Sequence, residues 1–388
     1  MMVSYKKTIY LDNAATTFPK PREVLEEMVE VYSRLGVSPG RGSYDLSMEA
    51  EERIMDIRRE VCQLFGGSDP ERVIFSYNAT DSLNTLIQGL ARPHSRVVSS
   101  RLEHNSVLRP LHYLSQQGIL GLDLIPFGSE GFIDPMAVAD AIRPDTSFVI
   151  LTHASNVLGT VQPVEQVGAI CRERRVPLLL DVTQTAGRLP IHMEAWGVSA
   201  VAFTGHKSLL GPTGIGGLVL SSGLDVEPTR FGGTGRDSLS LDHTQVYPQR
   251  LEPGTINVAG VFGLSAGLRF ISKRGMESLY AKELGLGRRL HDGLNSIRGA
   301  RVYPASLHDP WVPIMLCNVA GMDPEDLSSI LDGDFGIAAR AGLHCAPLVH
   351  EDLGTSPKGG VRFSLGPFNT DEDVDQVLEA MVRISHAR

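Results

Sequence analysis

The chain has 388 residues, 42% of them hydrophobic, which is enough for one large or two ordinary domains with a substantial core. Its net charge of −9 and the absence of a Lys/Arg cluster argue against a nucleic-acid partner. The first residues precede no apolar run, and no stretch approaches the roughly 18 apolar residues of a membrane span, so we expect neither a signal peptide nor a membrane partner. The four cysteines lack CxxC spacing, which predicts neither a metal site nor a disulfide framework. We expect a cytoplasmic protein whose thiols are reduced.

Strand-like and helix-like patterns alternate from about residue 70 to 220. This alternation predicts an α/β fold in which a mostly parallel, seven-stranded sheet is covered by helices on both faces. The predicted strands are residues 72–76, 96–100, 122–126, 147–152, 177–181, 201–203 and 217–221.

Helical patterns dominate beyond Pro253, with apolar residues recurring at steps of three and four from Val261 to Ile271 and a second helix over about 276–297. Short strands and helices mix from about residue 300, and Thr370 and Asp373 predict a capping box for the last helix. We therefore predict a large domain over 16–260 and a smaller α+β domain over 261–388, which the N-terminal segment 1–15 joins.

Two charged residues follow neighbouring predicted strands. Asp181 ends the run Val176–Leu180, and Lys207 comes shortly after Val201–Phe203. Ligands of parallel sheets bind at the carboxyl ends of strands. A lysine that forms a Schiff base and a carboxylate that keeps a ring nitrogen protonated are what pyridoxal 5'-phosphate (PLP) requires. The alternative for an isolated lysine is a solvated loop residue.

An anion cradle is predicted where a strand meets an apolar helix, at Asn78, Ala79 and Thr80. Small polar residues at a helix start offer hydroxyls and free N–H groups to a phosphate, although a plain N-cap by Asn78 or Thr80 explains the same pattern. Thr204 and His206, beside the lysine, are candidate phosphate donors.

Three further polar residues follow strands. His104 suits stacking on a planar cofactor, with a surface or capping histidine as the alternative. Asn156 and Gln184 are candidates for hydrogen bonds to the 3-hydroxyl of the cofactor ring.

Four runs occur in a set order: Tyr-Leu-Asp-Asn-Ala-Ala-Thr-Thr at 10–17, His-Ala-Ser-Asn-Val-Leu-Gly-Thr at 153–160, Asp-x-x-Gln at 181–184 and Thr-Gly-His-Lys-Ser-Leu-Leu-Gly-Pro at 204–212. Their joint order and spacing resemble the class V, fold type I PLP enzymes over almost the whole chain. The resemblance implies that Lys207 bonds to PLP, that Asp181 partners the pyridine nitrogen and that His104 stacks on the ring. It also implies a homodimer, because Thr255 matches a family residue that contacts the phosphate of the second subunit.

A second segment, Arg-Ala-Gly-Leu-His-Cys-Ala-Pro at 340–347, is similar to that of the Suf-type cysteine desulfurases and selenocysteine lyases. In that group the cysteine, here Cys345, accepts sulfur from L-cysteine. A reactive thiolate needs partial exposure and a nearby cation, for which Arg340 and His344 are candidates. The alternative is a buried structural cysteine, which is our interpretation of Cys62, Cys171 and Cys317.

The same resemblance implies that Arg362 binds the substrate carboxylate, a role that suits a planar guanidinium, with Asn156 and Arg340 as further substrate-binding residues. Two features depart from the family pattern. Leu343 replaces the first histidine of the usual His-His-Cys, and the segment between Cys345 and Arg362 is longer.

Three functions follow from these residues. The first is a PLP-dependent cysteine desulfurase that converts L-cysteine to L-alanine and forms a persulfide on Cys345 for a sulfur-acceptor protein. The second keeps PLP without a persulfide, as in a class V aminotransferase or a C–S or selenocysteine lyase. The third is a non-catalytic scaffold on a degenerate PLP fold, which the presence of both Lys207 and Asp181 disfavours.

Overall fold

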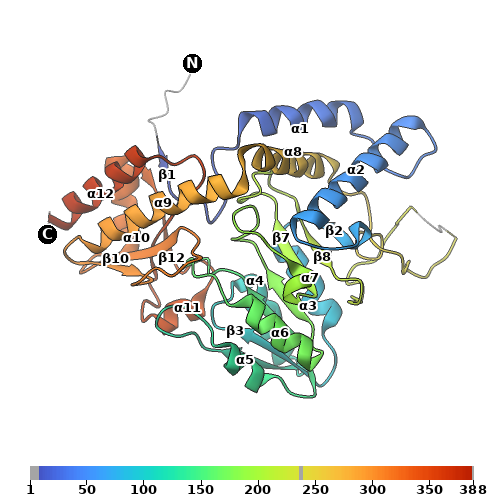
Figure 1. The fold of residues 1–388 in the computed structure, drawn as a ribbon, viewed down its shortest axis with the longest axis horizontal. Coiled ribbons are helices and arrows are strands. Elements are labelled where there is room, and N and C mark those ends of the chain that lie inside the picture. The colour runs from blue at the N-terminus through green and yellow to red at the C-terminus, as the bar shows by residue number, and fades with distance from the viewer. Residues whose placement is uncertain (1–7, 236–238, 387–388) are drawn as a thin grey trace.

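A computed structural model describes residues 8–235 and 239–386 (Figure 1). Within this part of the chain no helix is long and apolar enough to span a bilayer. The helices are α1 Arg22–Leu35, α2 Asp45–Leu64, α3 Ala79–Leu90, α4 Asn105–Gln116, α5 Pro135–Ala141, α6 Val164–Arg174, α7 Met193–Trp196, α8 Val258–Arg274, α9 Met276–Asn295, α10 Pro324–Phe335, α11 Pro347–Asp352 and α12 Asp371–His386.

A seven-stranded sheet forms the centre of the molecule, in the order β2-β8-β7-β6-β5-β3-β4. The strands from β3 to β7 pair in parallel, whereas β8 runs antiparallel to both β7 and β2. The predicted mostly parallel sheet is therefore confirmed. Its strands are β2 Val73–Ser76, β3 Ser95–Ser100, β4 Leu120–Ile125, β5 Thr146–Thr152, β6 Leu178–Asp181, β7 Ala200–Thr204 and β8 Gly216–Leu220.

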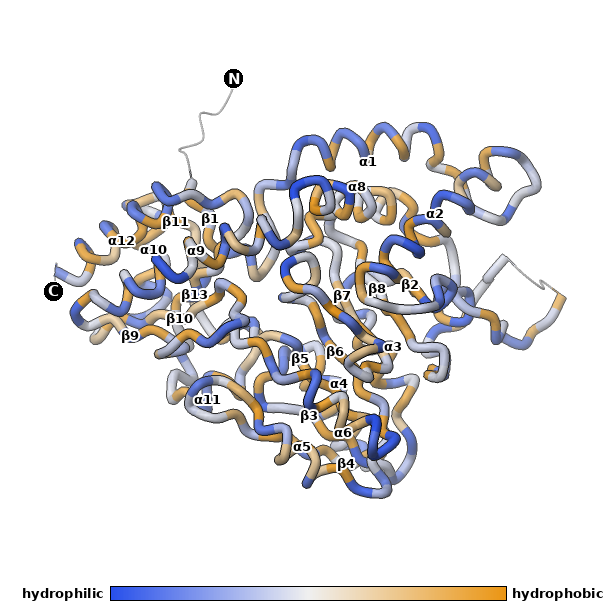
Figure 2. Tube along the Cα trace, in the orientation of Figure 1, coloured by the Kyte–Doolittle hydropathy of each residue, from blue (hydrophilic) through white to orange (hydrophobic). Residues whose placement is uncertain are grey.

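Both faces of this sheet are buried, which explains why its central strands read as continuous apolar runs. Successive side chains of β6 alternate between two hydrophobic clusters: Leu179 packs with residues of α3 and α4, whereas Leu178 and Leu180 pack with residues of α2, α6 and α8. The apolar segments lie along the central strands in Figure 2. Helices on both faces are thus confirmed.

A second region has its own hydrophobic cluster, built on the antiparallel sheet β12-β13-β10-β9 with α9, α10 and α12. The N-terminal strand β1 pairs with β11 in this region. The strands are β1 Ile9–Tyr10, β9 Ala300–Tyr303, β10 Ile314–Val319, β11 Ile337–Ala338, β12 Arg340–Gly342 and β13 Gly360–Ser364.

This second region is the predicted α+β unit, although its predicted limits stay a prediction. The proposed boundary at residue 260 falls inside α8, which packs against α1 and α2 in the cluster of the large sheet (Figure 1). Residues 1–7 of the predicted N-terminal segment lie outside the described residues.

The capping box of α12 is confirmed, because the Thr370 hydroxyl accepts from the Asp373 N–H at 3.2 Å and the Asp373 carboxylate accepts from the Thr370 N–H at 3.1 Å.

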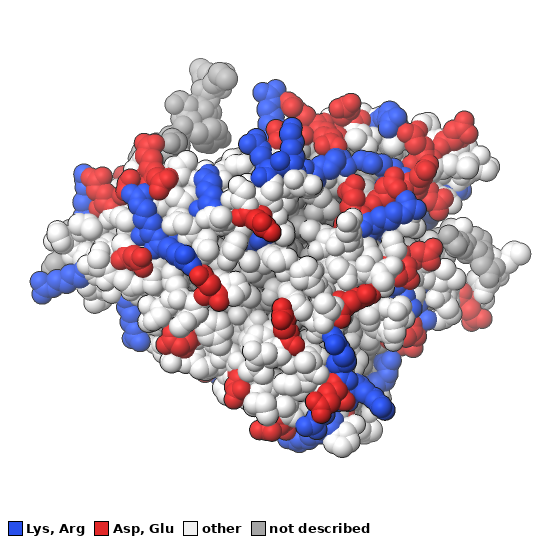
Figure 3. All heavy atoms as spheres, viewed as in Figure 1, with Lys and Arg blue, Asp and Glu red and all other residues white. Residues whose placement is uncertain are grey.

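Acidic and basic side chains interleave on the face shown in Figure 3. Several of them pair across elements, as Arg289 of α9 does with Asp371 of α12 at 2.9 Å.

Candidate active site

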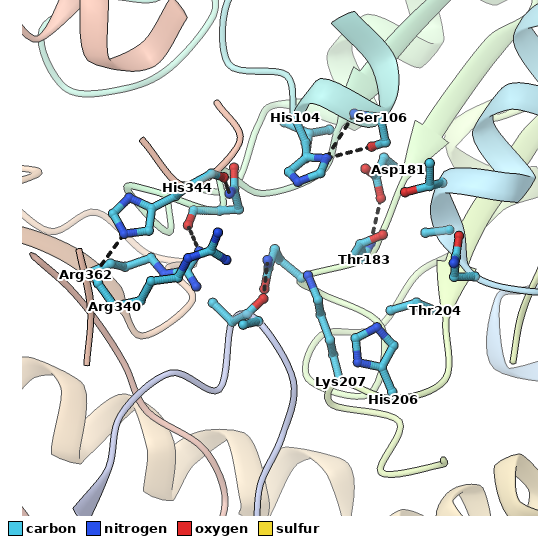
Figure 4. Close-up of a pocket in the computed structure, with 18 residues that line it drawn as sticks. His104, Ser106, Asp181, Thr183, Thr204, His206, Lys207, Arg340, His344 and Arg362 are labelled. Atoms are coloured by element: carbon cyan, nitrogen blue, oxygen red, sulfur yellow. Dashed lines mark hydrogen bonds between the residues drawn. The ribbon is translucent and has the colours of Figure 1, made fainter. Parts of the chain in front are cut away.

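A cavity of about 250 Å³ opens at the carboxyl ends of β5, β6 and β7, where loops of the large sheet meet the N-terminal segment and the second region (Figure 4). Twelve of the predicted site residues line it. Its walls are Ala14, Ala15, Asn78, Ala79, Thr80, His104, Ser106, Thr152, Asn156, Asp181, Thr183, Gln184, Thr204, His206, Lys207, Arg340, His344 and Arg362.

Lys207 follows β7 and points into this cavity (Figure 4). The Lys207 side chain is half-buried, because one side of it faces the cavity while protein atoms surround the rest, including the amine. Burial, reinforced by the positive charge of Arg362, lowers the pKa of Lys207 to about 7. A large share of the amine is therefore neutral near neutral pH, the form in which a lysine acts as a nucleophile or base.

Asp181 ends β6 with only 4% of its surface exposed. Parallel pairing places it opposite Thr152 at the end of β5 and Ala202 within β7, so β5 and β6 end side by side next to the last residues of β7. Its carboxylate accepts from the Thr183 N–H at 2.9 Å. Burial raises the pKa of Asp181, while the hydrogen bond from Thr183 and the charge of Lys207 lower it. A cationic ring nitrogen against this carboxylate would add to the latter effect.

The N-terminus of α3 forms one end of the cavity. Asn78 caps the helix, because its side chain accepts from the Asp81 N–H at 2.9 Å, so the N-cap alternative holds for this side chain. The capped helix still presents the N–H groups of its first turn, at Ala79 and Thr80, together with the positive end of its dipole. Thr204 also lines the cavity, and its buried hydroxyl has no hydrogen-bond partner within residues 8–235 and 239–386.

His104 and His206 line the cavity as neutral imidazoles. His104 precedes α4, and its Nδ1 accepts from the Ser106 N–H at 3.0 Å, so the ring carries its proton on Nε2. Burial, followed by the charge of Lys207, lowers the pKa of His104 to about 4. Burial likewise lowers the pKa of His206 to about 4, and its Nδ1 lies 3.0 Å from the Thr16 hydroxyl. Neutral imidazoles can stack on an aromatic ring or bind a phosphate oxygen without a charge penalty.

The opposite side of the cavity carries two arginines (Figure 4). Arg362, on β13, is 2% exposed; it pairs with Asp12 at 2.6 Å and donates to the Asn156 carbonyl at 3.1 Å. Its Nε is buried and has no hydrogen-bond partner in the described part of the chain. A carboxylate that binds Arg362 therefore meets a guanidinium already oriented by Asp12. Arg340, at the start of β12, is exposed.

Cys345 lies on a turn between β12 and α11, beside this cavity rather than in its wall. It is half-buried and lines two adjacent cavities, which share Arg340 and His344, or His104 and Ser106, with the main one. Both His344 and Cys345 adopt left-handed backbone conformations, with φ of 51° and 56°. Such conformations are rare for residues other than glycine and persist only where the surroundings hold them.

His344 is not the cation that we predicted beside Cys345. It is 3% exposed, and burial, followed by the charge of Arg362, lowers its pKa to about 2. Its Nε2 donates to the Arg340 carbonyl at 3.0 Å, and its ring stacks on that of His350 at 5.6 Å between centroids. It shapes the turn, and Arg340 remains as the predicted cation.

The other three cysteines are buried, as interpreted from their apolar surroundings. Burial raises the pKa of Cys171 and that of Cys317 to about 12, and raises that of Cys62. Thr255 lines other surface cavities and is not among the residues around Lys207, so its role toward a second subunit stays a prediction.

Several site residues escaped the sequence analysis. Ser106 orients His104, Thr183 binds Asp181, and Asp12 pairs with Arg362. Glu103 is fully buried, its carboxylate accepts from the Ser100 hydroxyl and the Thr152 N–H, and burial raises its pKa to about 8. Asp12 lies within the Tyr-Leu-Asp-Asn motif, which was the available signal; nothing in the sequence pairs it with a residue 350 positions away.

The lining fits PLP on its own chemistry. Buried oxygens of Thr183, Gln184 and Thr204 have no hydrogen-bond partner among the described residues and could bind a polar ligand. A helix N-terminus suits a phosphate, and the same cavity supplies a carboxylate for a ring nitrogen and an amine for an aldehyde. A plain hydrophobic pocket would supply none of these.

The profile of the family described as aminotransferase class V matches residues 9–377, so the chain belongs to this family. Among individual relatives, it is similar to a probable cysteine desulfurase of Methanothermobacter thermautotrophicus, with 32% identity over 97% of this chain and 94% of the relative. It is 29% identical to a cysteine desulfurase of Escherichia coli, over 97% of this chain and 93% of the other.

Solved structures of cysteine desulfurases are also similar to this chain. The apo structure of a cysteine desulfurase from Thermococcus onnurineus has a TM-score of 0.91 and 31% identity, covering 98% of this chain and 96% of the other. The cysteine desulfurase CsdA of Escherichia coli, solved as an S-sulfonic acid, has a TM-score of 0.88 and 29% identity, with coverage of 98% and 95%.

Proposed function

We propose that this protein is a PLP-dependent cysteine desulfurase that converts L-cysteine to L-alanine and retains the sulfur as a persulfide on Cys345. The observation that carries the proposal is the position of Cys345, a half-buried cysteine on a held turn next to the cavity of Lys207 and Asp181. The names of the relatives support it.

The residues on each wall of the cavity have separate roles in binding PLP. With PLP bound, Asp181 would hold a proton on the ring nitrogen, His104 would stack on the ring, and the first turn of α3 with Thr204 and His206 would bind the phosphate. Gln184, whose Oε1 is buried without a partner among the described residues, would bind the ring hydroxyl together with Asn156. When bound, PLP withdraws electrons from the substrate and so weakens its C–S bond.

Arg362, with Asn156 and Arg340 beside it, binds the substrate carboxylate, and Lys207 carries a proton to and from the substrate carbons. The Cys345 thiolate then attacks the substrate sulfur. A new S–S bond forms, the C–S bond breaks, and its electron pair stays with the substrate, whose carbon takes up a proton and leaves as L-alanine. No oxidant is required.

The proposal includes a homodimer in which Thr255 reaches the phosphate of the other subunit, and a sulfur acceptor downstream. It places the enzyme in the cytoplasm, where unpaired thiols such as the four cysteines stay reduced. The second candidate is a class V aminotransferase or a C–S or selenocysteine lyase in which Cys345 has no acceptor role; the partial exposure of Cys345 favours the first candidate.

Replacing Cys345 by serine tests the proposal. The wild-type protein, given L-cysteine without reductant, should release alanine and show added sulfur on the peptide that contains Cys345 by mass spectrometry. Cys345→Ser should lose sulfur release while it still binds L-cysteine, because binding needs the cavity alone. Cys62→Ala, at a buried cysteine, is the matched control and should keep sulfur transfer. Sulfur on another cysteine, or full activity of Cys345→Ser, would favour the second candidate.

A further inference from the structure

Two arginines flank Cys345. Arg109, an exposed residue of α4, and Arg340, an exposed residue of β12, line the same cavity as this cysteine. Across the described residues, neither guanidinium forms an ion pair with a carboxylate. Arg109 also lines the second cavity, on the α4 side of Cys345. Once the amino-acid product has left Arg340, both guanidinium groups are therefore free to bind an anion that approaches the sulfur.

The other charged groups of these cavities leave a positive excess. Lys358 is paired with Asp323 at 2.7 Å, so Glu325 is the one unpaired carboxylate among the described residues that line the first cavity. The described lining of the second cavity holds Arg109 and no carboxylate. An anionic group near Cys345 thus meets more positive than negative charge, whereas a cationic group is disfavoured.

The turn that carries Cys345 is tied down on both sides. The Cys345 carbonyl accepts from the Asn105 N–H at 2.7 Å, and the His344 carbonyl accepts from the Asn156 side chain at 2.7 Å. The Ala346 N–H closes the turn on the Leu343 carbonyl at 2.9 Å. A sulfur held in this way cannot travel outward on a flexible arm. The acceptor must bring its own thiol into the cavities beside the two arginines.

We propose that the sulfur acceptor is a small thiol that carries a carboxylate, bound by Arg109 and Arg340 next to Cys345. This inference rests on the proposed function. The acceptor thiolate attacks the outer sulfur of the Cys345 persulfide, a new S–S bond forms on the acceptor, and the S–S bond at Cys345 breaks. Its electron pair stays on the Cys345 sulfur as a thiolate, so the acceptor leaves as a persulfide and no oxidant or reductant is consumed.

The test separates the two halves of the reaction. The protein is loaded with L-cysteine without reductant and freed of substrate, and the persulfide on Cys345 is quantified by mass spectrometry. Transfer to 3-mercaptopropionate, 2-mercaptoethanol and cysteamine, whose second groups are a carboxylate, a hydroxyl and an ammonium, is then followed in a single turnover. Each rate is divided by the amount of persulfide loaded.

The decisive quantity is the ratio of the transfer rate with 3-mercaptopropionate to the transfer rate with cysteamine. This ratio is compared between the wild type and each variant, because the intrinsic reactivity of the two thiols is the same in every protein and cancels. We expect this ratio to fall by about fivefold in Arg109→Gln, the size of one exposed charge interaction, and to shrink in the wild type at high salt. Arg109→Lys should keep most of it. Arg174→Gln is the matched control, because this exposed arginine of α6 lines neither cavity.

An unchanged ratio in Arg109→Gln, with persulfide present on Cys345, would overturn the inference and leave the proposed function intact. A protein that never forms persulfide on Cys345 would overturn the proposed function, and the inference with it.

Discussion

The pocket around Lys207 and the turn around Cys345 are neighbours built in opposite ways. The pocket lies at the ends of parallel strands whose two faces are both packed, and its groups are surrounded by protein. The turn joins a short strand at the edge of the antiparallel sheet to a six-residue helix, and it borders open cavities. Covalent chemistry with a bound cofactor is assigned to the first, and exchange with molecules from solution to the second.

Different physical effects set the properties of the pocket and of the turn. Burial sets the charges of the pocket, lowering the pKa of Lys207 to about 7 and that of His104 to about 4. Backbone conformation controls the turn, where two consecutive left-handed residues are held by hydrogen bonds to Asn105 and Asn156. Tuned proton affinity thus requires enclosure, whereas presentation of a nucleophile requires a fixed but open loop.

Lys207→Ala is expected to have the largest effect. Loss of the amine should reduce alanine and persulfide formation together by about 10⁴-fold or more, the usual loss when a group that bonds covalently or moves protons is removed. Some PLP should still bind through the phosphate contacts, which equilibrium dialysis measures. Lys273→Ala, at an exposed lysine in the last turn of α8, should retain full activity. Near-normal turnover of Lys207→Ala would rule out the assignment of the pocket.

Asp181→Asn should reduce turnover by about 10²- to 10³-fold, because a neutral amide cannot hold the ring nitrogen protonated. The amide oxygen can still accept from the Thr183 N–H, so the loop should keep its shape and the protein its cofactor. Alanine release and bound PLP, measured on the same sample, check both parts. A rate close to wild type would mean that the ring lies in another orientation.

Glu283→Gln tests the contact between the second region and the region of the large sheet. Glu283 of α9 pairs at 2.7 Å with Arg188, whose guanidinium also donates to the Leu365 carbonyl at 2.9 Å; the two side chains are 3% and 1% exposed. Removing one partner of a buried pair leaves the other charge uncompensated, so the free energy of unfolding should fall by about 3 kcal/mol. Chemical denaturation measures it. Glu26→Gln, which breaks the exposed Arg22–Glu26 pair, is the control and should leave stability unchanged.

The smallest effect is a pH dependence that marks the enclosed pocket. The pKa of Lys207 is about 7 in the folded protein, against 10.5 for a free lysine, so ligand-free protein takes up a proton on unfolding between these values. Stability should therefore rise with pH above about 7, by up to roughly 1 kcal/mol per pH unit relative to Lys207→Met, which has no titrating group there. Denaturation of both proteins at pH 7, 8 and 9 gives the slope. A constant difference would show that the amine is solvated.

Much of the large sheet and of the site at its edge could be predicted from local patterns in the amino-acid sequence. The central strands β5, β6 and β7 are short, mostly apolar runs. Because parallel strands end at one edge of a sheet, the amino-acid sequence is enough to place Asp181 and Lys207 together. The capping box of α12 needs only residues three apart, which is why it too was predictable. The limits of the second region were harder, because α8 continues from one predicted domain into the other.

Pairs of residues far apart in the chain were beyond the sequence. Asp12 and Arg362 lie 350 positions apart, and no local pattern indicates that they form an ion pair. His344 was a candidate cation because it neighbours Cys345 in the sequence; only its enclosure beside Arg362 and His350 shows that it is neutral. Arg109 belongs to no motif, and only the packing of α4 beside the turn brings it to the cavity of Cys345.

The sequence by itself determined which residues end the strands of the parallel sheet, and with them the amine, the carboxylate and the helix start that form the pocket, because strand periodicity and strand ends are local properties. The tertiary structure decided the charge states of these groups and the exposure of Cys345. Burial, and hence proton affinity, depends on atoms contributed by distant segments, and a left-handed turn is stable only when those segments hold it.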